Sequence, residues 1–521
     1  MQSTQASPEV LSVESFSSRA FAWTLVISFC VPIFFHLVRR RQNVLPFPPG
    51  PEGLPVVGNV LDMPSRNQWL TYCRWGKQYN SDIVHAKVLG THVIVLNSTK
   101  ATCDLFEKRS SLYSDRPPLP SLTQLIRMSW NIAFLPYGPR WRTWRKVFHE
   151  HFHPQASRQY LPRELKATRQ LLVNLLRTPN NYRDHLRFMS GQIIMGIAYG
   201  IDIAPRDDPY ISLAERALQA VESASITGWT FDMLPFYMYL PWWFPGASFK
   251  KEAAILAPHI DEMLDRPYRA VKDALAKGIA VPSVAASMIT GLRGEPSHED
   301  ELTSKAVPAT MYLGGADTTA SAFLTFFLAM VLHPNAQRRA QMEIDRVVGT
   351  ARLPDFDDET TLPYVSALVK EVMRWHPVAP IAVPHRLAAD DIYEGYFLPA
   401  GSIVIGNTWA LLHDESVFPE PNRFWPERFL DPDVKLPDAV FGFGRRICPG
   451  RFMARSSMWI TIASVLAAFE ISPTTDGDGV PLMPAEDFTT GLISYPEAFA
   501  CAIRPRSKCA EGLIVAAMDA P

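Results

Sequence analysis

One of the six cysteines lies in a loop of unusual composition. The stretch FGFGRRICPG, residues 441–450, places Cys448 among glycines, arginines and a proline. Cys448 comes just before a strongly helical stretch, and the amides and dipole of a helix N-terminus favour a thiolate. Arg446 adds positive charge nearby. Such a thiolate could be a nucleophile, a redox sensor or a metal ligand, and the loop alone leaves these three chemistries open.

A second motif places an acid beside an alcohol. GGADTT, residues 314–319, contains Asp317 and Thr318 within a long run of helical periodicity. Two adjacent glycines inside a helix cost about 1 kcal/mol each relative to alanine, so they should serve some purpose. A close helix crossing with a threonine bonded back to its own helix is one interpretation. Proton transfer by the two side chains is the other.

Charged residues recur at regular spacing elsewhere. KEVMR, residues 370–374, places Glu371 and Arg374 three positions apart, on one face of a helix. FWPERF, residues 424–429, contributes Arg428 about twenty residues before Cys448. Taken alone, Glu371 and Arg374 are more typical of a surface salt bridge.

The motifs together resemble those of a known family. The string F-x-x-G-x-R-x-C-x-G is filled by Phe441, Gly444, Arg446, Cys448 and Gly450. It resembles the haem-binding signature of the cytochrome P450 monooxygenases, and the other motifs follow in the order found in that family. The resemblance implies that these residues bind haem b and that Cys448 is the axial ligand of its iron. An anionic sulfur donates electron density to the iron and favours O–O cleavage. The alternative for Cys448 is a buried, inert thiol.

The resemblance also assigns roles to the acid and the alcohol. Asp317 and Thr318 match the catalytic acid–alcohol pair, on a helix that is expected to be distorted where it passes the haem. Adjacent helical residues point about 100° apart. Thr318 is therefore expected to face the bound oxygen, and Asp317 to reach a solvent-linked proton route.

The remaining motifs imply structural and haem-binding roles. Glu371, Arg374 and Arg428 match a buried charged network in the family. For the haem propionates, WRTWR supplies Trp141 and Arg145, one helical turn apart. In VPHRL, either His385 or the adjacent Arg386 is expected to bind the other propionate.

The periodicity predicts a mainly α fold with small peripheral β-sheets, in one large domain. A hairpin is expected at 83–96, and strand-like segments occur at 396–412 and 488–505. Helix formers with apolar residues at a period of 3.6 occupy seven segments: 138–152, 216–224, 252–276, 306–333, 335–348, 362–375 and 451–469.

The amino terminus has the composition of a membrane anchor. Residues 20–38 contain one histidine and no formal charge, enough for about 28 Å of helix. Three arginines at 39–41 follow and are expected to stay cytosolic. The predicted organisation is a lumenal tail at 1–19, a transmembrane anchor at 20–38, a basic and proline-rich linker at 39–50, and a cytosolic domain at 51–521. The resulting location is the endoplasmic reticulum membrane, with a cleaved signal peptide as the alternative.

Composition narrows the choice of partners. The net charge is −1 and the chain has no long Lys/Arg run, so nucleic acid is not an expected partner. The resemblance implies that O2 and a hydrophobic small molecule are substrates. The substrate-lining segments it indicates are 115–135, 226–239, 312–316, 378–383 and 489–494.

Electrons must come from a partner, because no flavin or nicotinamide fingerprint is found in the sequence. The resemblance implies a membrane-bound NADPH-dependent reductase. The surface of this chain on which the reductase docks would comprise five basic residues: Arg142, Lys146, Arg445, Arg451 and Arg455. The alternative is that these residues are simply a solvated surface. The segment 234–251, with Trp242 and Trp243, is either a membrane-dipping loop or part of the core.

The expected activity is therefore insertion of one atom of O2 into an organic substrate. A haem-thiolate isomerase or dehydratase, which needs no external electrons, is the alternative from another reaction class, and a haem sensor is the third. The acid–alcohol pair argues against both. The greatest resemblance is to fungal microsomal members that act in secondary metabolism or in the broad oxidation of aromatic and foreign compounds.

Overall fold

The computed structural model describes residues 45–204, 207–292, 294–434 and 438–517. The predicted lumenal tail and transmembrane anchor lie outside the described residues. The chain forms two compact units, and the smaller one contains residues 45–48 and 390–399 of the described part. In it, β4 (Asp391–Tyr393) and β5 (Tyr396–Leu398) form an antiparallel hairpin.

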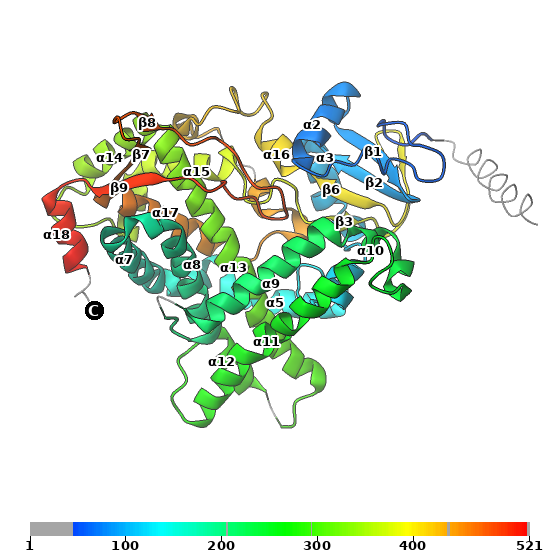
Figure 1. Cartoon of the computed structure of the whole chain (residues 1–521), viewed down its shortest axis with the longest axis horizontal. Coiled ribbons are helices and arrows are strands. Elements are labelled where there is room, and N and C mark those ends of the chain that lie inside the picture. Colours follow the sequence, from blue (N-terminus) through cyan, green and yellow to red (C-terminus); the bar gives the residue numbers. More distant parts are fainter. Residues whose placement is uncertain (1–44, 205–206, 293, 435–437, 518–521) are drawn as a thin grey trace, which may run out of the picture. The chain divides into compact units, whose positions relative to one another are not determined.

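The larger unit, residues 49–389 and 400–521, is mainly α-helical (Figure 1). Its α-helices are α2 (Gln68–Gln78), α3 (Thr99–Thr102), α4 (Ser110–Tyr113), α5 (Pro139–Phe152), α6 (Pro154–Ser157), α7 (Leu161–Arg177), α8 (Tyr182–Tyr199), α9 (Pro209–Thr227), α10 (Trp229–Met233), α11 (Phe249–Ala276), α12 (Val284–Gly291), α13 (His298–Leu332), α14 (Pro334–Val347), α15 (Pro363–Trp375), α16 (Thr408–Leu412), α17 (Arg451–Ala468) and α18 (Lys508–Ala516).

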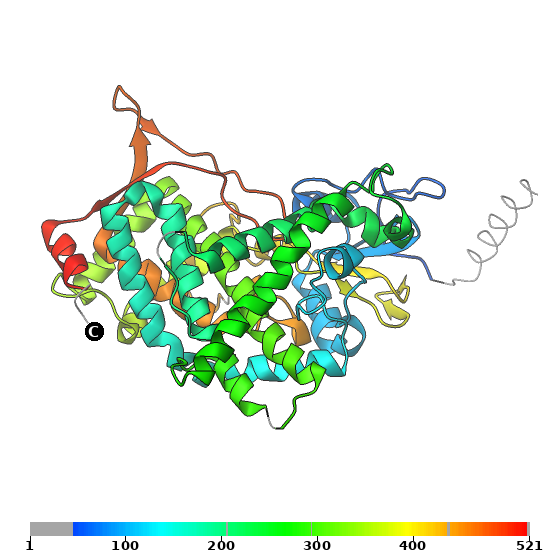
Figure 2. The same cartoon turned by 60° about the horizontal axis from the view of Figure 1, so that its bottom comes forward.

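Two small sheets complete the larger unit. The first has the order β1 (Ile83–Val88), β2 (Thr91–Leu96), β6 (Ile403–Gly406), β3 (His385–Arg386), and only the β2–β6 pair is parallel. The second has the order β8 (Pro481–Leu482), β7 (Phe469–Thr475), β9 (Cys501–Pro505). In Figure 2, β7 and β8 project as an arm from the helices. The prediction of a mainly α fold with small sheets is confirmed.

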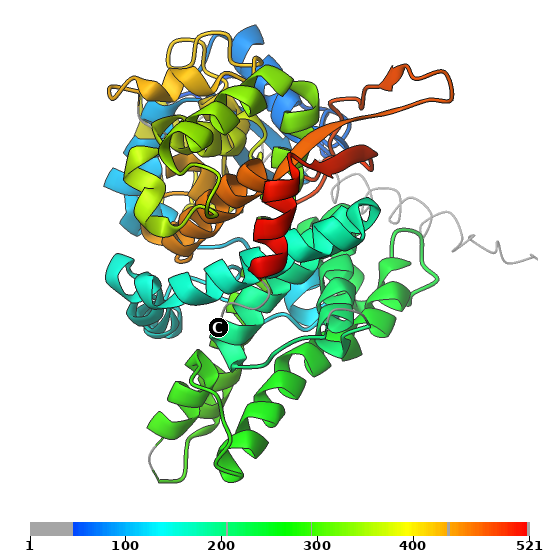
Figure 3. The same cartoon turned by 90° about the vertical axis from the view of Figure 1, so that its left-hand side faces the viewer.

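The central helix of this unit is α13, which is nearly enclosed by its neighbours. It packs along α8 and also contacts α11, α12 and α17. Among the described residues, α13 alone is long and apolar enough to cross a membrane, but 72% of its apolar window is buried inside the protein. Its composition is therefore that of a core helix. The C-terminal helix α18 packs on α7 and α17 at one end of the unit (Figure 3).

The seven predicted helices all form, and the hairpin at 83–96 is β1 and β2. Two of the predicted strand-like segments contain less β-strand than expected. Within 396–412 the chain turns into α16, because the Asn407 side chain caps this helix by accepting from the Ala410 amide at 3.3 Å. Within 488–505 only β9 is a strand, since residues 489–495 fold into a closed turn. The segments that form α7 and α8 were not singled out from the sequence.

Candidate active site

The cysteine loop connects two short 3-10 turns, Asp438–Phe441 and Gly444–Arg446, to the start of α17. The Cys448 amide donates to the Phe441 carbonyl at 2.7 Å, which closes the loop on itself. Gly444 has φ +50°, and a Cβ there would lie 2.1 Å from the Phe106 carbonyl oxygen. Only glycine fits at this position, because the loop rests directly on the backbone of residues 103–108.

The electrostatics at Cys448 differ in part from the sequence interpretation. Burial raises the pKa of the Cys448 thiol, whereas the Gly450 amide and the guanidinium groups of Arg145 and Arg451 lower it. Arg446 is not among these influences, because its side chain points to other backbone carbonyls. The helix start and its cations therefore reduce the energetic penalty of a thiolate without removing it, and a bound metal cation would be needed to hold the sulfur ionised.

Arg145 and Trp141 of α5 both lie against this loop. Arg145 donates to the Ile447 carbonyl at 2.5 Å, next to the cysteine. Arg446 stacks its guanidinium 4.6 Å from the centre of the Trp141 ring and donates to the Ser114 carbonyl at 2.8 Å. The structure thus brings Trp141, Arg145 and Arg446 together around the cysteine loop.

The sequence interpretation missed Arg116. This side chain is 6% exposed and donates to the carbonyls of Ala133 at 2.8 Å and Val383 at 2.6 Å. Burial, followed by the nearby charge of Arg446, holds the pKa of Arg116 well below its ordinary value. In the sequence, Arg116 stands between an aspartate and a proline, in DRPP, and this pattern does not indicate a functional arginine.

The choice between His385 and Arg386 is informed by their surroundings. His385 is buried, shares a 2.6 Å hydrogen bond between its Nδ1 and the Tyr113 carbonyl, and stacks on Phe106. Burial and the charge of Arg116 hold the pKa of His385 well below its ordinary value. Arg386 points outward, with its Nη1 3.7 Å from an Asp115 carboxylate oxygen. His385 is thus the one that lies in the buried basic group.

Among the described residues these cations make no direct ion pair, although the charge of Asp115 is close enough to raise the pKa of Arg116 and of Arg446. In the described part of the chain, no carboxylate lies within 4 Å of the guanidinium groups of Arg116, Arg145 or Arg446, which bond to backbone carbonyls instead. Burying like charges together is costly unless an anion accompanies them. A cofactor with two carboxylates beside the cysteine would supply that anion, so the residues present fit haem.

The predicted charged network forms one buried cluster. Glu371 and Arg374 make two hydrogen bonds of 2.8 Å, and Arg428 approaches the same carboxylate at 3.2 Å. Glu371 and Arg374 are fully buried. The Trp425 amide also donates to Glu371 at 2.7 Å, which joins α15 to the loop before Arg428. The alternative of a surface salt bridge is wrong.

The acid and the alcohol lie on different faces of α13. Thr318 Oγ1 donates to the Gly314 carbonyl one turn earlier, at 2.5 Å. A Cβ at Gly314 would meet nothing within 4 Å, whereas one at Gly315 would lie 2.9 Å from Ile194 Cγ1 of α8. Gly315 thus permits a close crossing, and Gly314 leaves room beside Thr318. The expected distortion is not found, because α13 is α-helical throughout this region.

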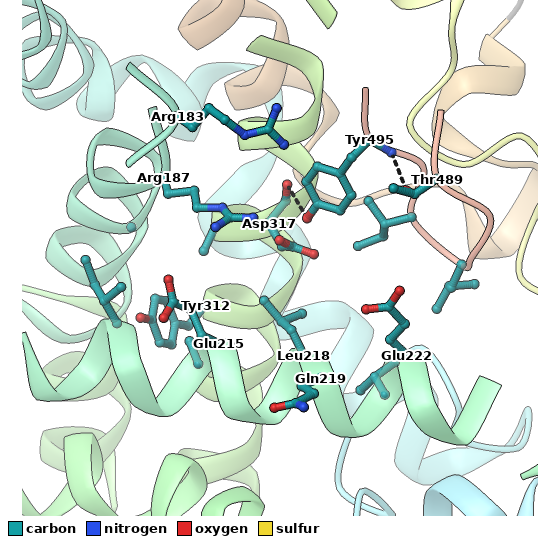
Figure 4. Close-up of a pocket in the computed structure, with 17 residues that line it drawn as sticks. Arg183, Arg187, Glu215, Leu218, Gln219, Glu222, Tyr312, Asp317, Thr489 and Tyr495 are labelled. Carbon is teal, nitrogen blue, oxygen red and sulfur yellow. Dashed lines mark hydrogen bonds between the residues drawn. The ribbon is translucent and has the colours of Figure 1, made fainter. Parts of the chain in front are cut away.

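Asp317 faces a cavity of about 500 Å³ with a mixed polar and apolar lining, bounded by α8, α9, α13 and the turn at 489–495 (Figure 4). The cavity contains part of the predicted substrate-lining set, but charged side chains also line it. They are Arg183, Arg187, Glu215, Glu222 and Asp317. Burial raises the pKa of Asp317, and Glu222 and Glu215 raise it further, whereas Tyr495 and Arg187 lower it. Apolar side chains, among them Ile211, Leu218 and Leu492, line the rest of the cavity, so this side of α13 combines charged groups with apolar surface.

The fold and the site have the architecture of a haem-thiolate enzyme. The cysteine loop precedes the helix α17, a buried basic group lies beside this loop, and the central helix α13 carries an acid next to an alcohol. The model of the cytochrome P450 family matches residues 48–496, and the chain belongs to that family.

Fungal monooxygenases are similar over nearly the whole chain. A cytochrome P450 monooxygenase of Armillaria gallica is 40% identical over 509 residues, covering 96% of this chain and 99% of the relative. The cytochrome P450 monooxygenase ple1 of Rhodocybe pseudopiperita is 40% identical, covering 94% and 95%. A tryptamine 4-monooxygenase of Psilocybe cyanescens is 38% identical, covering 93% and 97%. The chain is a monooxygenase of this family, whose members contain haem iron and use O2, a redox partner and a small-molecule substrate.

Proposed function

We propose that this protein is a membrane-anchored haem b monooxygenase that hydroxylates a hydrophobic small molecule in fungal secondary metabolism. The observation that carries the haem assignment is the buried basic group beside Cys448. In the part of the chain that the structure describes, no carboxylate lies within 4 Å of the guanidinium groups of Arg116, Arg145 or Arg446, and the two propionates of a haem would provide direct ionic partners.

Each part of the site would hold one part of the haem. Cys448 would bind the iron, with Phe441, Gly444 and Gly450 shaping the loop that presents its sulfur. Trp141, Arg145, Arg446, His385 and Arg116 would hold the propionates. Glu371, Arg374 and Arg428 brace the same side of the core.

Haem iron bound through a cysteine sulfur activates O2, so that one oxygen atom enters the substrate and the other leaves as water. This reaction consumes two protons. Asp317 contacts the cavity, and Thr318 lies on the adjacent face of α13 with its Oγ1 donating to the Gly314 carbonyl. Proton transfer by the pair would require this hydroxyl to turn away from its own helix. A carboxyl with a raised pKa retains a transferable proton nearer to neutral pH.

The relatives support a small organic molecule as substrate. One of them acts on tryptamine, as its name states, and the others that we cite are fungal monooxygenases. The apolar character of 378–383, with Val378 and Val383 packed against the main core, supports a hydrophobic substrate. Broad oxidation of aromatic or foreign compounds remains the second role to be tested with the same substrates.

Two exposed apolar segments support attachment to the endoplasmic reticulum membrane. Trp242 and Trp243 are 56% and 68% exposed, so the alternative of core packing does not apply to their side chains. Val56 and Leu61 are also largely exposed. Both segments border the apolar cluster around Tyr72, because Val60 and Met233 pack on it. Aromatic side chains of this kind partition into membrane interfaces.

The ligand assignment is tested by the carbon monoxide complex of the reduced protein. We expect the strongly red-shifted Soret band of thiolate-ligated haem, and we expect Cys448→Ser to abolish both this band and turnover. Cys509→Ser changes an exposed thiol far along the chain and should leave both intact. A wild-type band like that of a histidine-ligated haem would contradict the proposal.

The reaction class is tested in microsomes that contain an NADPH-dependent reductase. Mass spectrometry with a panel of hydrophobic indoles, terpenoids and polyketides should show products that gain one oxygen atom. Products of unchanged mass, formed without reductase, would instead indicate an isomerase. Alkaline carbonate washing tests the anchor, and extraction of the full chain into the wash would contradict it.

A further inference from the structure

The predicted substrate-lining segment 115–135 is a loop whose two ends are fixed beside the cysteine loop. Arg116, near its start, donates to the Ala133 carbonyl near its end at 2.8 Å. Arg446 of the cysteine loop donates to the Leu135 carbonyl, also at 2.8 Å. The ends of the segment are therefore held by two of the buried cations that we propose to hold the haem propionates.

The middle of this segment is attached to a different part of the protein. It forms a short π-helical turn, Ser121–Leu125, and Asp232 of α10 accepts two hydrogen bonds from the first residue of that turn. The Ser121 amide donates to Asp232 Oδ1 at 3.0 Å, and the Ser121 hydroxyl donates to Asp232 Oδ2 at 2.8 Å. Both oxygens of one carboxylate thus bond to a single residue of the turn.

The contact between the turn and α10 is closely packed. Ser121 is fully buried, and Gly228, which separates α9 from α10, lies directly against it (Figure 1). A Cβ at Gly228 would be 2.6 Å from Ser121 Cβ, so only glycine permits this approach. The buried Phe231 of α10 packs on Phe249 of α11, with ring centres 6.0 Å apart. Asp232 therefore extends from an element that is itself fixed to the core.

A second polar link joins the same segment to α11, but it is exposed. Arg127 pairs with Asp261 at 2.5 Å, and the two side chains are 59% and 44% exposed. Exposed ion pairs contribute little, because water and salt screen them. Hydrogen bonds to an ionised carboxylate are stronger, and a half-buried carboxylate that loses its donors is destabilised. Of the two links, the one between Ser121 and Asp232 is therefore expected to hold the turn.

We propose that Asp232 is a positioning residue for the substrate site: its carboxylate holds the turn at 121–125 against α9 and α10 and thereby sets the size of molecule that reaches the haem. The inference rests on the proposed function and on the predicted substrate-lining roles of 115–135 and 226–239. Because the ends of the loop are fixed separately, loss of this contact would free the middle of the loop and leave its ends in place.

Asp232→Ala in the haem-loaded full chain tests this role, with stopped-flow absorbance following two ligands of the haem iron. We expect ketoconazole, a bulky apolar azole, to associate five- to tenfold faster, because the turn no longer has to be released first. Association of imidazole should change less than twofold, since so small a molecule does not require the turn to move. Unchanged or slower association of ketoconazole, or equal changes for both ligands, would overturn the proposal.

Two milder variants separate the hydrogen bonds from the charge. The side chain of Asp232→Asn can accept from the Ser121 amide and donate to the Ser121 hydroxyl, so its ketoconazole rate should stay within twofold of wild type. Ser121→Ala removes one bond and keeps the other, and it should accelerate association two- to threefold even if Asp232→Ala does not fold. Acceleration in Asp232→Asn equal to that in Asp232→Ala, or none in Ser121→Ala, would overturn the role of these bonds.

A second readout needs no ligand of the haem. Hydrogen–deuterium exchange with mass spectrometry measures how often backbone amides open. In Asp232→Ala we expect peptides that cover 121–125 to exchange at least tenfold faster, because the Ser121 amide loses its acceptor. Peptides that cover 132–135 should exchange as in the wild type, since Arg116 and Arg446 still hold that end. Faster exchange at both places would indicate a general defect and would overturn the proposal.

Asp261→Ala is the matched control. It breaks the exposed pair with Arg127 in the same loop and leaves Ser121 and Asp232 in contact. Both association rates should therefore match the wild type. Acceleration as large as that of Asp232→Ala would mean that any loosening of the loop suffices and that Asp232 has no special role.

The carbon monoxide complex distinguishes this inference from the proposed function. A reduced wild-type protein without the red-shifted Soret band would overturn the proposed function and this inference together. A normal band with unchanged association of ketoconazole in Asp232→Ala would overturn only the positioning role.

Discussion

At the scale of single residues, the protein buries cations where an anionic cofactor would lie and buries an isolated acid elsewhere. Burial and the charge of Arg446 lower the pKa of Arg116, whereas Asp115 raises it, and the proposed anionic cofactor would relieve the remaining repulsion. Glu164 of α7 is the opposite case. It is fully buried against α17, and neither of its carboxyl oxygens has a hydrogen-bond partner within the described residues.

Glu164 should make the stability of the protein depend on pH. Burial raises its pKa from an ordinary value of 4.5 to about 8. Between these values the folded protein holds a proton that the unfolded chain releases, so the free energy of unfolding falls as pH rises. We expect this group to reduce it by on the order of 3 kcal/mol between pH 5 and 8. Glu164→Gln should flatten that slope in urea unfolding.

The exposed Glu415→Gln is the control for Glu164, because it removes one carboxylate without changing a buried group. It should retain the wild-type slope. Parallel pH profiles for wild-type protein and Glu164→Gln would show that Glu164 is ionised in the folded state.

At the scale of elements, periodicity predicts the helices well and contacts between distant segments poorly. The apolar pattern was sufficient for α13, α15 and α17, because each buries most of its apolar side chains in the core. Local capping by Asn407 was not recognised, so α16 was taken for strand. The residues of the candidate site differ in the same way: some are indicated by local motifs and others only by contacts between distant segments. Cys448 and Asp317 lie in recognisable motifs, whereas Arg116 is placed beside the cysteine loop by contacts with partners far along the chain.

The two glycines of α13 should respond differently to substitution. Alanine at Gly315 would place its Cβ 2.9 Å from Cγ1 and 3.3 Å from Cβ of the buried Ile194. Overpacking of this kind costs about 1–3 kcal/mol, more than the roughly 1 kcal/mol gained from helix propensity. Gly315→Ala should therefore lower the thermal midpoint of the haem-loaded protein.

Gly314→Ala is the matched comparison, because its Cβ would meet no protein atom within 4 Å. We expect it to retain or slightly raise the thermal midpoint. The reverse order of the two midpoints would show that α8 and α13 are not in close contact at Gly315.

At the scale of the whole molecule, exposed basic side chains are found on the surface next to the cysteine loop. Exposed Arg142 and Lys146 on α5 lie beside a loop that carries exposed Arg445, and Arg145 joins α5 to that loop through the Ile447 carbonyl. Lys146 has only a 3.9 Å contact with Glu150. Basic residues around the proposed axial ligand suit an acidic redox partner, which must bring its electrons close to the iron.

Reversing these charges should slow electron delivery without affecting the site itself. With an NADPH-dependent reductase at low ionic strength, we expect Arg142→Glu combined with Lys146→Glu to slow haem reduction about tenfold. The difference should shrink as added salt screens the charges of the wild type. Reduction by dithionite needs no docking and should be unchanged. Lys272→Glu, an exposed reversal on α11, is the control. Equal slowing by Lys272→Glu would mean that net charge, rather than this face, governs the encounter.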